Sequence, residues 1–178
     1  MMHRTVNCRC GALRVEIDGA PMIGAECYCT SCRTAGARLG ALPGAPQFHN
    51  ADGGTPYALY RKDRVRFTHG TDLLRAYRLT PESKTRRVVA VCCNSPVFVE
   101  FQSGHWLSLY ASLWPKAEAP TMQLRTMVSD LPETVHLDDR LPNARHQTLG
   151  FFAALLGAWV AMGFKVPKLD FVKGAIDA

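Results

Sequence analysis

The cysteines are the residues of this chain with the clearest chemical potential, because all seven fall in three tight clusters. Cysteines spaced by one or two residues supply two thiolates from one turn, and this suits the tetrahedral coordination of Zn²⁺. The pattern therefore predicts a zinc–thiolate protein that binds one or two zinc ions. The predicted metal ligands are Cys8, Cys10, Cys27, Cys29, Cys32, Cys92 and Cys93.

Two other uses of cysteine fit the sequence less well. Burial as small hydrophobic residues would explain isolated cysteines but not clusters. Disulfides normally need an even number of cysteines and an oxidising compartment, whereas this chain has 7 and its first residues lack the apolar core of an export signal. We therefore expect reduced thiols and a cytoplasmic location.

The central cluster, called the cysteine trio below, consists of Cys27, Cys29 and Cys32. Three protein ligands leave one position of a tetrahedral zinc open. An open position is typical of a catalytic zinc, because water or a substrate thiolate can occupy it. The alternative is that a distant residue closes the site, and the candidates for that role are Cys92, His49, His69 and His105.

The length of the chain bears on the size of its domain, and its net charge bears on nucleic-acid binding. A chain of 178 residues with 47% hydrophobic composition is long enough for one sizeable domain or for a small domain with an elaborated tail. The formal charge of +6 is only mildly basic, and no basic block interleaved with aromatic residues is present. Nucleic-acid binding is therefore not expected.

The elements that must position the cysteines are predicted to be mainly short β-strands. Apolar segments rich in β-branched and aromatic residues alternate with Gly, Pro and Asn turn signals, which favours antiparallel hairpins. Residues 34–42 are predicted to form a short helical turn after the cysteine trio. The expected strands cover residues 12–17, 57–60, 65–68, 73–79, 87–91, 97–102, 106–113, 121–127 and 134–137.

A C-terminal helix is predicted over residues 143–164, with Asn143 as its N-cap. Residues 149–164 carry no charge, so a membrane span has to be considered. This run is shorter than the 20 or so apolar residues of a spanning helix and holds three glycines, so a membrane anchor is not favoured. We expect the helix to pack on the sheet or against a second subunit, in a homodimer.

The cysteine motifs resemble those of a known family. Cys8-Arg-Cys10-Gly and Cys27-Tyr-Cys29-Thr-Ser-Cys32-Arg match the first two motifs of the glutathione-dependent formaldehyde-activating (GFA) enzymes and the related centromere-protein-V domain. The resemblance covers about residues 4–114 and implies a zinc-bearing β-tent fold. The chain then divides into a zinc-binding domain at residues 1–114 and an extension at residues 115–178.

The resemblance also implies a function. In the family, the first and last cysteine pairs hold a structural zinc, and the central trio holds a labile zinc linked to thiol chemistry. The implied activity is that of a carbon–sulfur lyase acting on glutathione–aldehyde adducts, with glutathione or another small thiol as partner. Arg33 and Arg87 are predicted to bind the substrate carboxylates, since guanidinium forms bidentate pairs with them. The competing hypothesis is a non-catalytic, zinc-stabilised binding or dimerisation module.

The sequence departs from the family's motifs at two places. The family's third motif is C-x-x-C-G, but here Ala90 stands at its first cysteine and Cys92 lies two residues later. Either Cys92 joins Cys93 and the first pair at one metal, or it approaches the cysteine trio and closes that site. Tyr28 also stands where the enzymes usually have histidine.

Overall fold

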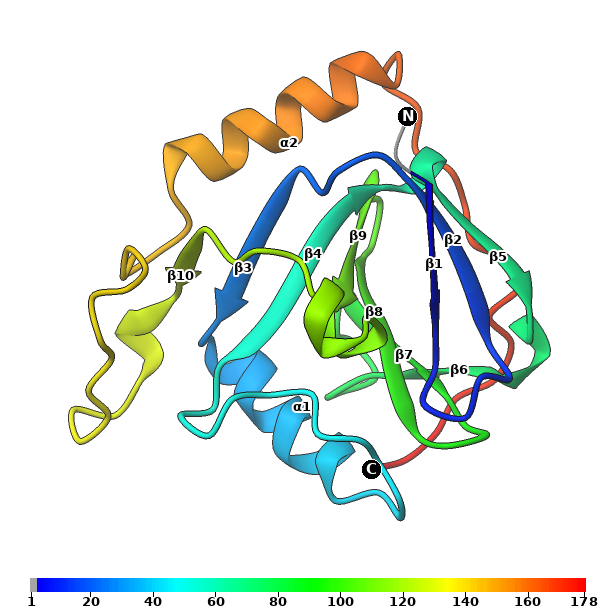
Figure 1. Cartoon of the computed structure of the whole chain (residues 1–178), viewed down its shortest axis with the longest axis horizontal. Coiled ribbons are helices and arrows are strands. Elements are labelled where there is room, and N and C mark those ends of the chain that lie inside the picture. Colours follow the sequence, from blue (N-terminus) through cyan, green and yellow to red (C-terminus); the bar gives the residue numbers. More distant parts are fainter. Residues whose placement is uncertain (1–2) are drawn as a thin grey trace.

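The computed structural model describes residues 3–178, which form two β-sheets and two α-helices (Figure 1). One sheet has three strands in the order β1-β2-β5, and the other has seven in the order β10-β3-β4-β9-β8-β7-β6. The mainly β prediction with a C-terminal helix is confirmed. The strands are β1 (His3–Asn7), β2 (Arg14–Asp18), β3 (Ile23–Cys27), β4 (Thr55–Arg61), β5 (Val65–His69), β6 (Leu74–Tyr77), β7 (Thr85–Ala90), β8 (Ser95–Phe101), β9 (Trp106–Tyr110) and β10 (Leu124–Thr126), and the helices are α1 (Thr30–Gly40) and α2 (Leu149–Ala161).

The pairing of the strands is antiparallel, as predicted, with one exception. β10 runs parallel to β3, with Thr126 opposite Cys27. Strands joined by tight turns pair antiparallel, but β10 reaches the sheet edge only after the intervening strands and the loop at residues 115–123, so turn geometry does not fix its direction. Close contact also shapes this edge, because a Cβ on Gly24 would lie 2.1 Å from the carbonyl oxygen of Thr121.

Two predictions for the C-terminal part are wrong. Residues 134–137 form a loop rather than a strand, and this segment gains no neighbouring strand to pair with. Helix α2 begins after Thr148, whose hydroxyl accepts a hydrogen bond from the backbone N–H of Phe151 at 3.1 Å. Asn143 is therefore not the N-cap, and its side chain instead accepts a hydrogen bond from Arg125 at 3.2 Å.

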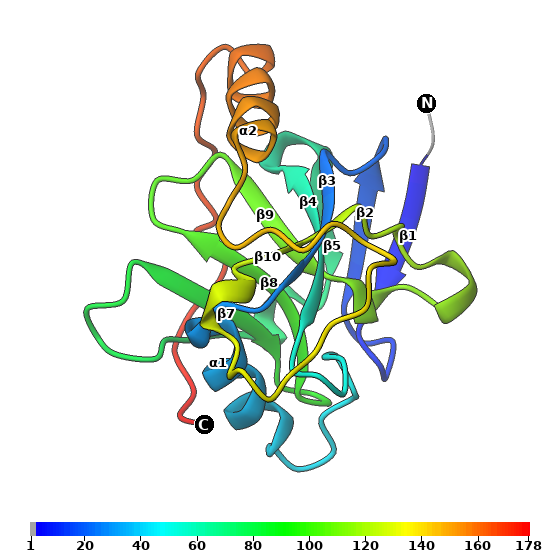
Figure 2. The ribbon, with the colours of Figure 1, turned by 90° about the vertical axis from the view of Figure 1, so that its left-hand side faces the viewer.

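The large sheet has a hydrophobic cluster on each face. Between the two sheets, Val15 of β2 packs in the same cluster as Leu107 and Leu109 of β9. On the opposite face, α1 and α2 cover a second cluster that includes Leu39 and Leu155, and Figure 2 shows the two helices at opposite ends of the sheet. The seven cysteines lie in the turns that follow β1 and β7, at the end of β3 and at the start of α1.

Helix α2 packs on the molecule along one face only. Its Leu155 and Ala158 are buried, and the backbone oxygen of Leu155 lies 2.9 Å from Nε2 of His105. Its other face exposes a stripe of large apolar side chains. The homodimer through this helix stays a prediction. Among residues 3–178, no helix combines the length and the apolar character needed to cross a bilayer. The exposed stripe on α2 consists of Leu149, Phe152, Leu156 and Val160, and Phe164 is exposed just beyond the end of the helix.

Candidate metal centres

Four cysteines meet where the β1–β2 turn lies against the β7–β8 turn, and we call them the cysteine tetrad: Cys8, Cys10, Cys92 and Cys93. Successive Sγ–Sγ distances are 3.6 Å for Cys8–Cys10, 3.4 Å for Cys10–Cys92 and 3.9 Å for Cys92–Cys93, and Cys8 lies 3.7 Å from Cys92. Zn–S bonds of about 2.3 Å place the corners of a tetrahedron about 3.8 Å apart. The tetrad therefore has the donor type and spacing of a four-sulfur zinc site.

The position of Cys92 decides between the two alternatives left open by the sequence. Cys92 lies in the tetrad together with Cys93 and does not approach the cysteine trio. Residues 91–94 form a turn, and Asn94 has a left-handed φ of 50°, so the side-chain alternation of a strand does not apply here. The turn lets two adjacent sulfurs face the same side.

Hydrogen bonds hold the tetrad sulfurs in place. The backbone N–H of Leu13 donates to Cys8 Sγ at 3.3 Å. The Ser95 hydroxyl lies 3.0 Å from Cys93 Sγ and accepts a hydrogen bond from the Arg9 N–H at 3.1 Å, so its proton is available to the sulfur. Although burial opposes ionisation, the hydrogen bonds from Ser95 and the Cys10 backbone lower the pKa of Cys93 to about 6.

The cysteine trio lies where β3 leads into α1, and its three sulfurs are within 4.8 Å of one another. Cys27 ends β3, and Cys29 is the N-cap of α1, with its Sγ accepting the Cys32 N–H at 3.3 Å. The positive end of the helix dipole favours thiolates at this point. The sequence predicted a helical turn at residues 34–42, whereas the helix begins earlier, inside the cysteine cluster itself.

The three thiols of the trio differ in acidity. Hydrogen bonds from Cys27 and Cys29, followed by the charge of Arg87, hold the pKa of Cys32 well below its usual range, although burial opposes them. The hydroxyl of Tyr57 also lies 3.7 Å from Cys32 Sγ and donates to it. The pKa of Cys27 is raised, chiefly by its hydrogen bond with Cys29. Of the three thiols, Cys32 is therefore the one whose thiolate form its surroundings favour most.

Within residues 3–178, no fourth cysteine, histidine or carboxylate joins the trio. The residues proposed to close the site lie elsewhere. His105 bonds to Leu155 and stacks on Trp159 with ring centroids 5.8 Å apart, His49 lies against Gly40 of α1, and His69 ends β5. Both clusters could hold a metal ion, and the trio leaves one coordination position open to other ligands.

The two predicted substrate arginines lie in different surroundings. Arg33 is half-buried and donates to the backbone oxygen of Asp130 at 3.0 Å. Arg87 is fully buried and donates through Nη2 to the carbonyl and hydroxyl of Ser31, at 3.0 and 2.8 Å. Its Nε and Nη1 atoms have no hydrogen-bond partner among the described residues. Arg87 thus lies beneath the trio, which does not favour direct contact with a substrate carboxylate.

Tyr28, at the position where the family usually has histidine, is also fully buried. Its hydroxyl lies 2.9 Å from Asp52 and 3.2 Å from Glu26, and Glu26 in turn accepts a hydrogen bond from Arg125 at 3.0 Å. This network fixes the segments on both sides of the trio. Asp52 and Arg125 lie too far from Tyr28 in the sequence for the network to have been identified there.

A cavity of about 330 Å³ adjoins the trio, and we call it the channel. Cys27 and Cys32 form part of its wall, and its other side chains are apolar or aromatic, with a few uncharged polar groups. Sequence reasoning missed it, because its walls come from separate strands and from α2. The lining residues are Ala25, Cys27, Cys32, Tyr57, Leu59, Val99, Phe101, Trp106, Ser108, Thr126, Gln147, Phe151, Phe152 and Leu155.

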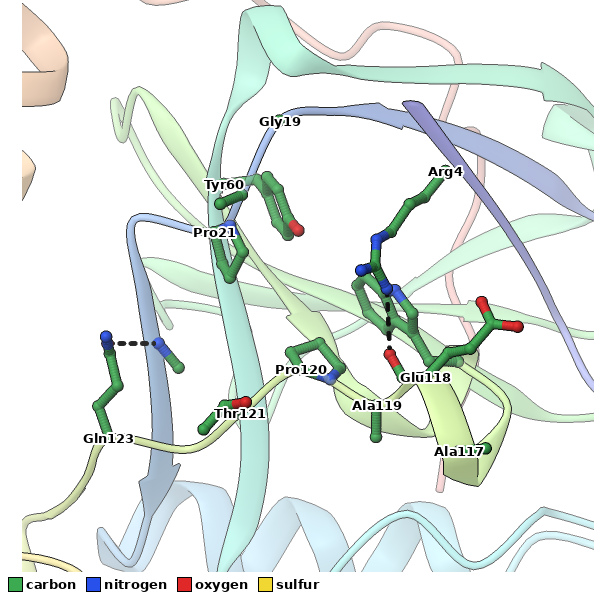
Figure 3. Close-up of a pocket in the computed structure, with 13 residues that line it drawn as sticks. Arg4, Gly19, Pro21, Tyr60, Ala117, Glu118, Ala119, Pro120, Thr121 and Gln123 are labelled. Atoms are coloured by element: carbon green, nitrogen blue, oxygen red, sulfur yellow. Dashed lines mark hydrogen bonds between the residues drawn. The ribbon is translucent and has the colours of Figure 1, made fainter. Parts of the chain in front are cut away.

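A larger hollow of about 450 Å³ lies elsewhere, and none of the described residues that line it is a cysteine. Figure 3 shows Arg4 reaching across it, where it donates to the backbone oxygen of Glu118 at 3.3 Å. Tyr60 and Trp114 stack beside it, with ring centroids 6.3 Å apart. Neither cysteine cluster borders this larger hollow, so the channel beside the trio is the better candidate for a reaction site.

Comparison with known proteins gives one family match. The family model described as glutathione-dependent formaldehyde-activating enzyme matches residues 3–124. No curated protein matches the chain. A crystal structure of a Rhodobacter sphaeroides protein from structural genomics is 16% identical, covers 64% of this chain and 89% of its own, and has a TM-score of 0.45.

Proposed function

This chain belongs to the glutathione-dependent formaldehyde-activating enzyme family, and from that premise we propose that it is a zinc-dependent carbon–sulfur lyase. The proposed substrates are adducts between a small thiol, such as glutathione, and an aldehyde. The proposed reaction centre is the cysteine trio. We also propose that the protein acts in the cytoplasm, because a reducing compartment keeps clustered thiols available for metal binding.

The observation that carries this proposal is the open position of the trio beside a cavity. Three sulfurs lie within 4.8 Å of one another without a fourth ligand from residues 3–178, and two of them line the channel. Three protein ligands and one free position are the arrangement of catalytic zinc sites, whereas structural sites have four protein ligands. The tetrad fits the second description, so we propose that it is the structural site.

The proposed reaction is reversible addition of a thiol to an aldehyde. The thiol gives up its proton, its sulfur forms a bond to the carbonyl carbon, and the carbonyl oxygen takes a proton to become a hydroxyl. Cleavage runs through the same steps in reverse, so no oxidant or reductant is consumed. A zinc ion held by the trio would keep the substrate thiol deprotonated near neutral pH.

Residues around the trio would support this chemistry. The buried charge of Arg87 and the hydroxyl of Tyr57 favour the thiolate form of Cys32, and thiolates are the form that binds metal. We propose that Arg33, which follows the trio directly and is partly accessible, binds a carboxylate of the thiol substrate. Arg87 is proposed to act through the trio rather than on the substrate.

The second candidate function is a non-catalytic binding or dimerisation module. The observation in its favour is the apolar stripe on α2, where Leu156 and Val160 are 57% and 52% exposed. Large apolar patches often mark interaction surfaces. In this case both metals would be structural, and an exogenous ligand would complete the trio without reacting.

The test combines zinc content with activity in wild type, Cys29→Ser and Cys93→Ser. We expect two zinc ions in wild type and one in each variant, because the two residues belong to separate clusters. Cys29→Ser should abolish adduct formation between glutathione and a panel of aldehydes beginning with formaldehyde, yet keep the far-UV circular dichroism spectrum. Cys93→Ser should instead lower the melting temperature. A wild type with two zinc ions and no adduct formation would favour the binding module.

A further inference from the structure

The channel is almost entirely uncharged, although it adjoins a metal-binding cluster. Apart from the sulfurs of Cys27 and Cys32, its polar side chains are Tyr57, Trp106, Ser108, Thr126 and Gln147, and no Lys, Arg, Asp, Glu or His is among its lining residues. Burying a charged group in such surroundings without a partner is costly. The channel therefore suits an apolar ligand and disfavours the carboxylates of glutathione.

The channel runs along the face of the large sheet. At one end Cys27 lies opposite Thr55, the first residue of β4, and at the other Trp106 lies opposite Arg61, the last residue of that strand. Because a strand rises about 3.3 Å per residue, the backbone of β4 from Thr55 to Arg61 spans about 20 Å. A ligand with its reacting carbon at the trio thus has room for a long apolar substituent.

The far part of the channel is built by the C-terminal extension. Phe151, Phe152 and Leu155 of α2 supply apolar surface, and the contact between His105 and the Leu155 backbone holds the helix in place. These helix residues lie outside the segment at residues 3–124 that matches the family. Part of the apolar wall of the site therefore comes from outside the segment that matches the family.

Among the described residues, the Thr126 hydroxyl is one of several buried polar groups near the trio without a hydrogen-bond partner, and it lines the channel. Thr126 is 4% exposed, lines the channel and lies opposite Cys27 in the parallel pairing of β10 with β3. Its hydroxyl makes no hydrogen bond among the described residues. Buried hydroxyls are normally hydrogen-bonded, so this one is available to an oxygen of a ligand at the trio.

From these observations we propose that the aldehyde partner of the reaction is hydrophobic, with its alkyl or aryl group in the channel and its oxygen beside the Thr126 hydroxyl. This inference rests on the proposed lyase function and names its substrate class. The thiol adds to the carbonyl carbon, the C=O π electrons move to the oxygen, and the proton lost by the thiol ends on that oxygen. Formaldehyde has no substituent and would leave the channel unfilled.

The first arm of the test measures binding without reaction. Primary alcohols from ethanol to octanol resemble the aldehydes but form no thiol adduct, and their binding to the zinc-loaded full-length chain can be followed by titration calorimetry. We expect the affinity to rise about fourfold for each added methylene until the channel is filled. A series with no dependence on chain length would overturn the inference.

The second arm uses two matched variants in α2. Phe152 and Leu156 are 55% and 57% exposed, but only Phe152 lines the channel. Phe152→Asp should weaken octanol binding at least tenfold, because it places a charge in the apolar wall, whereas Leu156→Asp should change it less than twofold. Both positions are accessible to solvent, so neither change should unfold the chain. Equal effects of the two variants would contradict the assignment of the channel.

The third arm measures kcat/KM for aldehydes of increasing length with one thiol. The inference predicts that octanal is a better substrate than formaldehyde. If no aldehyde reacts but the alcohol series still rises, the lyase proposal fails and the apolar ligand class stands. If formaldehyde reacts as well as octanal and the alcohol series is flat, the lyase proposal stands and the inference is wrong.

Discussion

Gly54 leaves the space that the Tyr28 ring needs beside the cysteine trio. A Cβ at this position would lie 2.4 Å from the ring carbon that bears the hydroxyl and 2.6 Å from the hydroxyl oxygen. Tyr28 cannot retreat easily, because it is fully buried and its hydroxyl is fixed by Asp52. The fit between these two residues therefore supports the loop that faces the trio.

We expect Gly54→Ala to lower the free energy of unfolding by about 2–3 kcal/mol, as overpacking of a rigid site does. The matched control is Gly157→Ala in α2, where a new Cβ meets nothing within 4 Å. Because alanine is the better helix former, that change should raise the free energy of unfolding by about 0.5–1 kcal/mol. Urea unfolding of both variants measures the difference, and equal destabilisation would contradict the proposed close packing.

At the residue scale, the sequence predicted the cysteine clusters but not their surroundings. The clusters are recognisable because spacing alone brings neighbouring sulfurs together. The partners of Arg87 and Tyr28 are not, because Ser31 and Asp52 lie 56 and 24 residues away from them. Whether Cys92 belonged to the tetrad or the trio depended on the turn conformation at residues 91–94, which the sequence left open.

The elements that were predicted best are those with strong local patterns. β4, β5 and β8 contain β-branched and aromatic residues between clear turns, and they were located within a few residues. β1 and β3 were missed, since His3–Asn7 and Ile23–Cys27 have little apolar alternation and become strands through pairing with their neighbours. The start of α2 was misplaced because Asn143 and Thr148 are both acceptable N-caps.

The attachment of α2 to the sheet should depend on pH through His105. Burial, the largest effect, lowers the pKa of this imidazole, although its bond to the Leu155 backbone opposes the shift. The neutral form is favoured in the folded state, so the stabilisation is complete above the unfolded pKa of about 6.5 and is lost as pH falls through the lower folded value.

The measurement is urea unfolding at pH 7.5 and pH 5.5, in wild type and in His105→Gln. Glutamine can still donate to the Leu155 oxygen but does not titrate in this range. We expect wild type to lose more stability than the variant between the two pH values. Zinc content must be followed in parallel, because thiolate ligands also take up protons as pH falls. The same loss in both proteins would show that His105 is not the titrating group.

At the scale of the whole molecule, the channel depends on the meeting of segments that are distant in the sequence. Its walls combine the trio, the face of the large sheet and α2, and only the tertiary fold brings them together. The sequence located α2 approximately and predicted that it packs on the sheet or against a second subunit. The cavity beneath it followed from no local pattern, since apolar residues that line a channel and those that fill a core look alike in a sequence.

The exposed face of α2 leads to a prediction about assembly. Leu149, Phe152, Leu156 and Val160 recur at intervals of three or four residues, so they lie on one side of the helix. Identical stripes on two copies can pair about a two-fold axis, as in most homodimers. Light scattering after size-exclusion chromatography should give a dimer for wild type and a monomer for Val160→Asp. A monomeric wild type at high concentration would contradict the prediction.

The two cysteine clusters differ in coordination, because the tetrad supplies four sulfurs to a closed site and the trio supplies three to an open one. The most direct test of this difference is ¹¹³Cd nuclear magnetic resonance of the cadmium-substituted protein during titration with a small thiol. We expect two cadmium resonances, of which the one from the tetrad stays fixed while the one from the trio shifts as thiol enters the open position. A single resonance, or two that both ignore the added thiol, would contradict it.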